Sequence, residues 1–114
     1  MKNFNLENYE RIIKSGDKAV IFFTSPSCHL CEKLKPVILK LEKKYGHVFN
    51  FYSANVSTEK ELASVILKNE GVPTAFILSS GSLFKVKDPD DPDDKTWYTF
   101  EYLSKVIEKN LKEK

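Results

Sequence analysis

The sequence predicts an α/β protein with a mixed sheet of four or five strands and helices on both faces. Three observations indicate this fold class. Short apolar runs alternate with segments of helical periodicity, each helical segment has one apolar stripe, and only the turn SSGS separates the last two strand candidates. The first strand–helix–strand unit requires a parallel pair, whereas the last two strands form a hairpin, so the sheet is mixed.

The composition is that of one ordinary globular domain, which we expect to span residues 1–114. The chain is 41% hydrophobic and 30% charged. Its 18 basic and 16 acidic residues give a formal net charge of +2, which disfavours nucleic acid or an anionic membrane as a partner. The N-terminal segment lacks the apolar core of a secretory signal, and no run approaches a membrane span. We therefore expect a cytoplasmic protein, and a monomer.

The first half of the chain contains one predicted strand between two predicted helices. Residues 6–14 place their apolar side chains on one face, and Asn5 can cap this helix. The run AVIFFT, residues 19–24, predicts a strand buried on both faces. A second helix is predicted from about residue 28 to residue 45, with Gly46 ending it. Its apolar stripe consists of Leu34, Ile38, Leu41 and Tyr45.

A further strand and a third helix follow. The run VFNFYSA, residues 48–54, predicts a strand because it is mostly apolar or aromatic. Thr58 and Glu61 have the spacing of a capping box, which predicts a helix that begins there and ends near residues 69–71. We expect this helix to bury Leu62, Val65 and Ile66.

The chain then continues with a hairpin, a loop and a helix. The run TAFIL after Pro73 and residues 83–87 are the two predicted strands of the hairpin. Residues 88–98 form an acidic Pro/Asp loop, because the two prolines and five aspartates of DPDDPDD cannot sit in a β-ladder. The predicted last helix covers about residues 99–111. Its apolar stripe consists of Phe100, Leu103, Ile107 and Leu111.

The acidic loop permits several interpretations. Calcium binding is disfavoured, because Pro89 and Pro92 interrupt the ligand spacing and the loop has no central glycine. A solvated, mobile loop is the default. A partner-recognition loop is the alternative, because Trp97, the only tryptophan of the chain, follows the aspartates. Trp97 fits equally well as a core residue folded back onto the sheet.

Both cysteines of the chain, Cys28 and Cys31, lie where strand 19–24 passes into the following helix. Unpaired N–H groups and the positive end of the helix dipole stabilise a thiolate on the first cysteine. A thiolate is the nucleophile in disulfide exchange. The second cysteine lies one turn along and can attack the mixed disulfide that the first forms. The spacing thus favours a redox pair, with Cys28 as nucleophile and Cys31 as resolving thiol.

Other roles for the cysteine pair have to be weighed. A zinc site within one chain needs about four ligands, and only His29 and His47 are further candidates, so we expect no metal there. A metal shared by two chains requires a dimer. A structural disulfide at this spacing closes too small a loop to add much stability. Chance proximity of two unrelated cysteines stays open, because the CxxC spacing alone is a weak signal.

Two segments resemble motifs of the thioredoxin family. VIFFTSPSCHLCEKLKP, residues 20–36, resembles the family's active-site segment, including a proline five residues after the second cysteine. GVPTAFIL, residues 71–78, resembles the motif whose proline forms a cis peptide facing those cysteines. The order of elements agrees over about residues 17–112. The resemblance implies a thioredoxin fold, a cis Val72–Pro73 bond and a thiol–disulfide oxidoreductase that needs no bound cofactor.

The resemblance also implies a shallow substrate groove and two kinds of partner. Protein disulfides would be the substrates, and a thiol reductase such as thioredoxin reductase would supply electrons. The backbone of Val72 would pair with an extended substrate peptide by strand addition. An ordinary trans proline opening a strand is the alternative for Pro73. The expected groove residues are Pro26, Ser27, His29, Leu30, Val72 and Pro73.

The sequence departs from the family pattern at several positions. Ser27 replaces the usual tryptophan before the first cysteine, and Phe22 replaces a buried acid that helps to deprotonate the second. His29–Leu30 stands in place of Gly–Pro. A protonated His29 would stabilise the Cys28 thiolate, whereas an exposed histidine would have little effect. These departures leave open the direction of electron flow. They also leave open a non-enzymatic binding module on the same fold and a dimer-bridged metal carrier.

Overall fold

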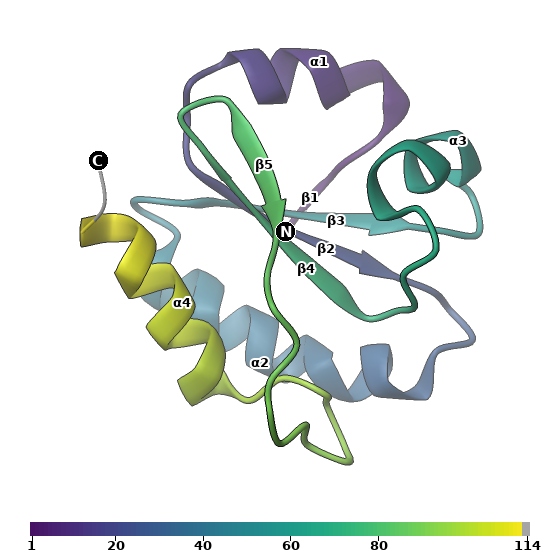
Figure 1. The fold of residues 1–114 in the computed structure, drawn as a ribbon, viewed down its shortest axis with the longest axis vertical. Coiled ribbons are helices and arrows are strands. Elements are labelled where there is room, and N and C mark those ends of the chain that lie inside the picture. The colour runs from purple at the N-terminus through teal and green to yellow at the C-terminus, as the bar shows by residue number, and fades with distance from the viewer. Residues whose placement is uncertain (113–114) are drawn as a thin grey trace.

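The chain, described over residues 1–112 by a computed structural model, forms a five-stranded mixed sheet with helices on both faces (Figure 1). The α/β prediction is confirmed. The predicted domain, residues 1–114, includes residues 113 and 114, which lie outside the described part. The strands are β1 (Lys2–Asn3), β2 (Ala19–Thr24), β3 (Asn50–Asn55), β4 (Thr74–Ser79) and β5 (Ser82–Lys85). The helices are α1 (Leu6–Lys14), α2 (His29–Tyr45), α3 (Lys60–Leu62) and α4 (Phe100–Lys112).

The strand order is β1-β3-β2-β4-β5. β3 is parallel to both β1 and β2, whereas β4 is antiparallel to its neighbours β2 and β5. The register pairs Phe23 near the end of β2 with Thr74 at the start of β4. The segment that follows β2 and the segment that precedes β4 therefore meet at the same end of these two strands. These are the two segments that carry Cys28 and Pro73.

The sheet separates two hydrophobic cores, because alternate residues of β2 face opposite sides. Val20 and Phe22 pack in the core on the side of α2 and α4. Ile21 and Phe23 pack on the side of α1 and α3. Both strand faces are thus buried, as predicted. The α2 stripe of Leu34, Ile38, Leu41 and Tyr45 is buried in the first core, also as predicted.

The helix ends follow the expected caps at α1 and α2. Asn5 caps α1 in a reciprocal box, in which the Asn8 N–H donates to Asn5 Oδ1 at 3.0 Å and the Asn5 N–H donates to Asn8 Oδ1 at 2.9 Å. Cys28 is the N-cap of α2, and Gly46 is its C-cap. The first cysteine therefore lies at the helix N-terminus, where the sequence placed it.

The predicted capping box at the third helix is wrong. Glu59 is the N-cap of α3, and no side chain donates or accepts a capping hydrogen bond there. The Thr58 hydroxyl instead donates to the Asn55 carbonyl at 3.2 Å. The Asn55 side chain accepts from the Ser57 N–H at 2.9 Å. The turn at the end of β3 therefore engages the Thr58 hydroxyl, which the predicted capping box would have needed.

The buried face of the third helix also differs from the prediction. A π-helical segment, Ala63–Leu67, continues α3 and adds one residue to the turn. The extra residue moves the buried position from the expected Val65, which is 58% exposed, to Leu67, which lies in the core with Leu62. Ile66 is half-buried. A period of 3.6 residues cannot anticipate this shift.

The remaining boundaries differ modestly from the prediction. β3 begins at Asn50 rather than at residue 48, and Val48 is exposed. β5 covers Ser82–Lys85 rather than residues 83–87. The two-residue β1 has no hydrophobic pattern of its own and pairs at the edge of β3. Among residues 1–112, no helix combines the length and apolar character that a membrane span requires.

Candidate active site

Cys28 and Cys31 are joined by a disulfide, with their Cα atoms 5.2 Å apart. The two residues differ in exposure. Cys31 is 3% exposed and lies in the first turn of α2, whereas Cys28 is half-buried at the helix cap. A partner protein can therefore reach the sulfur of Cys28 more readily than that of Cys31.

The backbone around Cys28 favours negative charge on its sulfur. The Cys31 N–H donates to the Cys28 Sγ at 3.1 Å. This group is one of the N–H groups that a helix leaves unpaired in its first turn. In the reduced protein the same N–H and the helix dipole stabilise a thiolate over a thiol. The local structure thus supplies the electrostatic support that the position of Cys28 in the sequence predicts.

The second motif lies directly against the cysteines. The Val72–Pro73 peptide is cis, as the resemblance implied. The Val72 carbonyl oxygen lies 3.7 Å from the Cys28 Sγ. The Thr74 hydroxyl donates to the Gly71 carbonyl and closes the turn that carries Pro73 into β4. Two segments far apart in sequence therefore form one site.

A hollow of about 180 Å³ adjoins the site on the Pro73 side. Three of the expected groove residues line it: Leu30, Val72 and Pro73. A second hollow, of about 190 Å³, is lined by Pro26 together with Cys31. Ser27 and His29 are exposed and line neither hollow. The structure therefore divides the six predicted groove residues among two hollows and the surface around Cys28.

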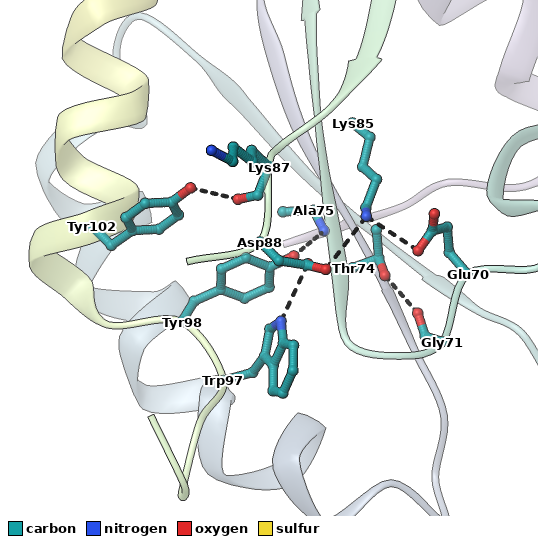
Figure 2. Close-up of polar contacts among 10 residues, drawn as sticks. All are labelled: Glu70, Gly71, Thr74, Ala75, Lys85, Lys87, Asp88, Trp97, Tyr98 and Tyr102. Atoms are coloured by element: carbon teal, nitrogen blue, oxygen red, sulfur yellow. Dashed lines mark hydrogen bonds and ion pairs between the residues drawn. The ribbon is translucent and has the colours of Figure 1, made fainter. Parts of the chain in front are cut away.

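Residues that the sequence analysis did not assign to the groove complete the first hollow. Glu70, Asp88 and Trp97 also line it. The Trp97 Nε1–H donates to Asp88 Oδ1 at 3.3 Å, and Lys85 Nζ lies 3.5 Å from Asp88 Oδ2 (Figure 2). Lys85 also donates to Glu70 Oε2 at 3.1 Å. The hydrogen bond to Glu70 raises the pKa of Lys85 above its ordinary value, although the partial burial of Lys85 acts in the opposite direction.

Two tyrosines anchor the acidic loop to the sheet and to α4. The Tyr98 side chain is fully buried, and its hydroxyl accepts from the Ala75 N–H at 3.2 Å (Figure 2). Burial raises the pKa of Tyr98 to about 12. The Tyr102 hydroxyl donates to the Lys87 carbonyl. Trp97 is half-buried: it packs against the core, as one of the two predictions expected, and it also lines the hollow.

The position of the family's buried acid is apolar here. Phe22 is fully buried in the core and packs there with Leu34. Polar side chains near Cys31 come from elsewhere: Glu32, Lys35 and Asn55 line its hollow, and Lys35 Nζ lies 3.3 Å from Glu32 Oε2. Over residues 1–112, no three side chains of His, Cys, Asp or Glu are grouped to hold a metal ion.

A CxxC disulfide at a helix N-terminus, placed against a cis-proline at a strand start, defines the thioredoxin-like class of α/β proteins. Sequence comparison agrees, because the thioredoxin family model matches residues 1–97. The chain belongs to the thioredoxin family.

Individual relatives agree with this assignment. A thioredoxin of Borreliella burgdorferi is 33% identical over 67 residues, 58% of this chain and 57% of the relative. An H-type thioredoxin of Fagopyrum esculentum is 33% identical over 75 residues, 66% of this chain and 63% of the relative. The aligned part thus spans less than two thirds of these relatives.

Solved structures show the same fold. Oxidized mitochondrial thioredoxin 3 of Saccharomyces cerevisiae superposes with a TM-score of 0.78 at 23% identity, covering 96% of this chain and 94% of that one. The J-Trx1 fragment of ERdj5 gives a TM-score of 0.78 at 19% identity, covering 95% of this chain and 50% of that one. The predicted thioredoxin fold is confirmed.

Proposed function

We propose that this protein is a thiol–disulfide oxidoreductase that exchanges disulfides with protein substrates. One observation carries the proposal. The accessible Cys28 forms a disulfide with the buried Cys31, and its sulfur lies against the Cys31 N–H and the Val72 carbonyl. The N–H favours the attacking thiolate, and the adjacent backbone offers a place for an extended peptide.

Reduction of a substrate proceeds in two exchange steps. The Cys28 thiolate attacks one substrate sulfur, the substrate disulfide breaks, and the released thiolate takes a proton from solvent. The Cys31 thiol then loses its proton and attacks the Cys28 sulfur, which releases the second substrate thiolate. Two electrons pass to the substrate, and the Cys28–Cys31 disulfide forms. Oxidation of a substrate dithiol is the reverse sequence.

The remaining site residues contribute binding. The Val72 backbone pairs with the substrate peptide, and Leu30 and Pro73 contact its side chains. Other contacts come from the exposed surface around Cys28, which consists of Pro26, Ser27 and His29. A thiol reductase of the thioredoxin reductase kind restores the dithiol. We place the protein in the cytoplasm as a monomer with no resident cofactor.

The test replaces each cysteine by serine and follows the reduction of insulin by dithiothreitol. We expect Cys28→Ser to abolish the catalysed reaction, because the attacking thiolate is absent. Pre-reduced Cys31→Ser, mixed with insulin in the absence of dithiothreitol, should stop after the first step and accumulate a protein–insulin mixed disulfide, visible on non-reducing gels. The two variants are matched controls for each other. Undiminished turnover by Cys28→Ser would disprove the proposal.

A binding module without redox activity is the second candidate, favoured by the buried Phe22 at the acid position. A redox titration of the cysteine pair separates the candidates. A strongly reducing potential indicates a disulfide reductase, and a higher potential indicates an oxidase or isomerase. A pair that does not cycle indicates the binding module. Metal analysis of the purified protein tests the dimer-bridged carrier, which predicts a stoichiometric metal.

A further inference from the structure

Both apolar and acidic residues line the hollow beside Pro73. Leu30, Val72 and Pro73 are its apolar residues, and Glu70 and Asp88 are its acidic residues. Trp97 also lines the hollow and donates to Asp88.

The two acidic residues of the hollow carry an excess of negative charge. Lys85 is the one cation paired with Glu70 and Asp88 among the described residues, and it contacts both carboxylates. One lysine against two carboxylates leaves one negative charge uncompensated. Asp90 of the same loop is paired with Lys87 at 3.9 Å, and the exposed Asp91 does not line the hollow.

The hollow also lies where the side chain next to a substrate cysteine would reach. Val72 lines the hollow, and its carbonyl oxygen lies 3.7 Å from the Cys28 Sγ. A peptide whose sulfur meets Cys28 and whose backbone follows Val72 directs neighbouring side chains to alternate faces. The hollow has a volume of about 180 Å³, which suits a single long side chain.

We propose that this hollow binds a lysine or arginine side chain adjacent to the reactive cysteine of the substrate. The methylene stem lies on Leu30 and Trp97, while the cationic head reaches Glu70 and Asp88. The inference rests on the proposed function and names the substrate class of the same site. Substrates with basic residues beside their disulfide are therefore preferred.

Trp97 supplies the aromatic surface of this arrangement. Its indole is fixed by the hydrogen bond to Asp88, and its backbone pairs with Asp93 in both directions, at 2.9 and 3.1 Å. Its φ of 68° is a left-handed conformation that few tryptophans adopt. Position 27, before the first cysteine, is a serine, so Trp97 provides aromatic surface to the groove from a different segment.

The test uses symmetric peptide disulfides that differ at one residue next to cysteine: arginine, norleucine or glutamate. The reduced protein is mixed with each peptide, quenched with acid and analysed by chromatography. Each rate constant is divided by that of dithiothreitol with the same peptide, which removes differences in intrinsic reactivity. We expect the arginine peptide to react roughly threefold to fivefold faster than the norleucine peptide, and the glutamate peptide to react slowest. The preference should shrink at high salt.

Variants locate the source of the preference. Glu70→Gln combined with Asp88→Asn should bring the arginine-to-norleucine ratio close to one. Asp91→Asn is the matched control, because it removes a loop carboxylate that does not line the hollow and should preserve the ratio. Trp97→Ala should slow the arginine and norleucine peptides alike, and Trp97→Phe should retain most of the rate. Single Glu70→Gln and Asp88→Asn variants keep the test available if the double variant is unstable.

The outcomes separate the two proposals. Absence of reaction with every peptide overturns the proposed function. Equal normalised rates for the arginine and norleucine peptides overturn the inference alone, as does a ratio that survives the double substitution. A ratio lost equally in Asp91→Asn would assign the preference to the general field of the loop and would also overturn it.

Discussion

The carboxylate of Asp88 shows how a single side chain organises this site. One oxygen accepts from Trp97, and the other lies 3.5 Å from Lys85. Lys85 in turn bonds Glu70, which directly precedes the segment carrying Val72 and Pro73. The acidic loop is therefore linked through three side chains to the segment that faces the cysteines.

Tyr98 carries the stability prediction at the residue scale. Its buried hydroxyl is the acceptor for the Ala75 N–H, so Tyr98→Phe leaves a buried donor unpaired. We expect the free energy of unfolding to fall by about 1–3 kcal/mol, measured by urea denaturation. Tyr102→Phe is the control, because its hydroxyl lies at the surface and donates to a carbonyl that water can also satisfy. An equal loss in both variants would contradict this explanation.

The sequence predicted the reactive residues of the site better than the residues that line the adjoining hollow. Cys28, Cys31 and Pro73 were recognisable from local spacing and motif, and the structure brings them together. Glu70 and Asp88 carry no local signal, because only the hairpin β4–β5 brings their segments together around Lys85. Hydrophobic periodicity does not reveal tertiary contacts between residues that lie outside the recognised motifs.

At the scale of elements, sequence reasoning worked where one interaction dominates. β2 is a continuous apolar run, and α2 has a clear stripe and a glycine end, so both were predicted closely. α3 is different, because its start and its face depend on competing polar contacts and on an extra residue in the turn. The Asn55 carbonyl takes the Thr58 hydroxyl, and the π-helical segment replaces Val65 with Leu67 in the core.

The end of that π-helical segment supports a stabilising substitution. Lys68 has φ 58° and ψ −122°, a conformation that costs a non-glycine residue steric strain. We expect Lys68→Gly to raise the free energy of unfolding by about 1 kcal/mol. Lys60→Gly in α3 is the matched control and should lower it by roughly 0.5–1 kcal/mol. Thermal or urea unfolding of the three proteins provides the measurement, and destabilisation by both changes would refute the assignment of strain to Lys68.

For the whole molecule, the buried and paired groups around the acidic loop predict how stability depends on pH. The pKa values of Lys85, Tyr98 and Tyr102 are all raised in the folded protein, the first by Glu70 and the tyrosines by burial. A raised pKa stabilises the fold below the unfolded value, and this contribution is lost as pH rises through the folded value. For Tyr98 this range runs from its ordinary 10.0 to about 12.

Stability should therefore decline between pH 10 and about pH 12, the range set by Tyr98. Urea midpoints measured at intervals from neutral to alkaline pH follow this decline. Tyr98→Phe should unfold more easily at neutral pH yet show a shallower alkaline decline, because it has no phenol to ionise. An equally steep alkaline decline in Tyr98→Phe would show that ionisation of Tyr98 does not cause the loss of stability.

The antiparallel pairing of β2 and β4 gives the molecule two dissimilar ends. The cysteines and Pro73 occupy one, and the Ser80–Gly81 turn lies at the other, a full strand of roughly 20 Å away. Both turn residues have positive φ, which suits the tight hairpin there. That turn is consequently the natural handle for a fluorophore, a linker or attachment to a solid support, because cargo fixed there leaves the approach to Cys28 open.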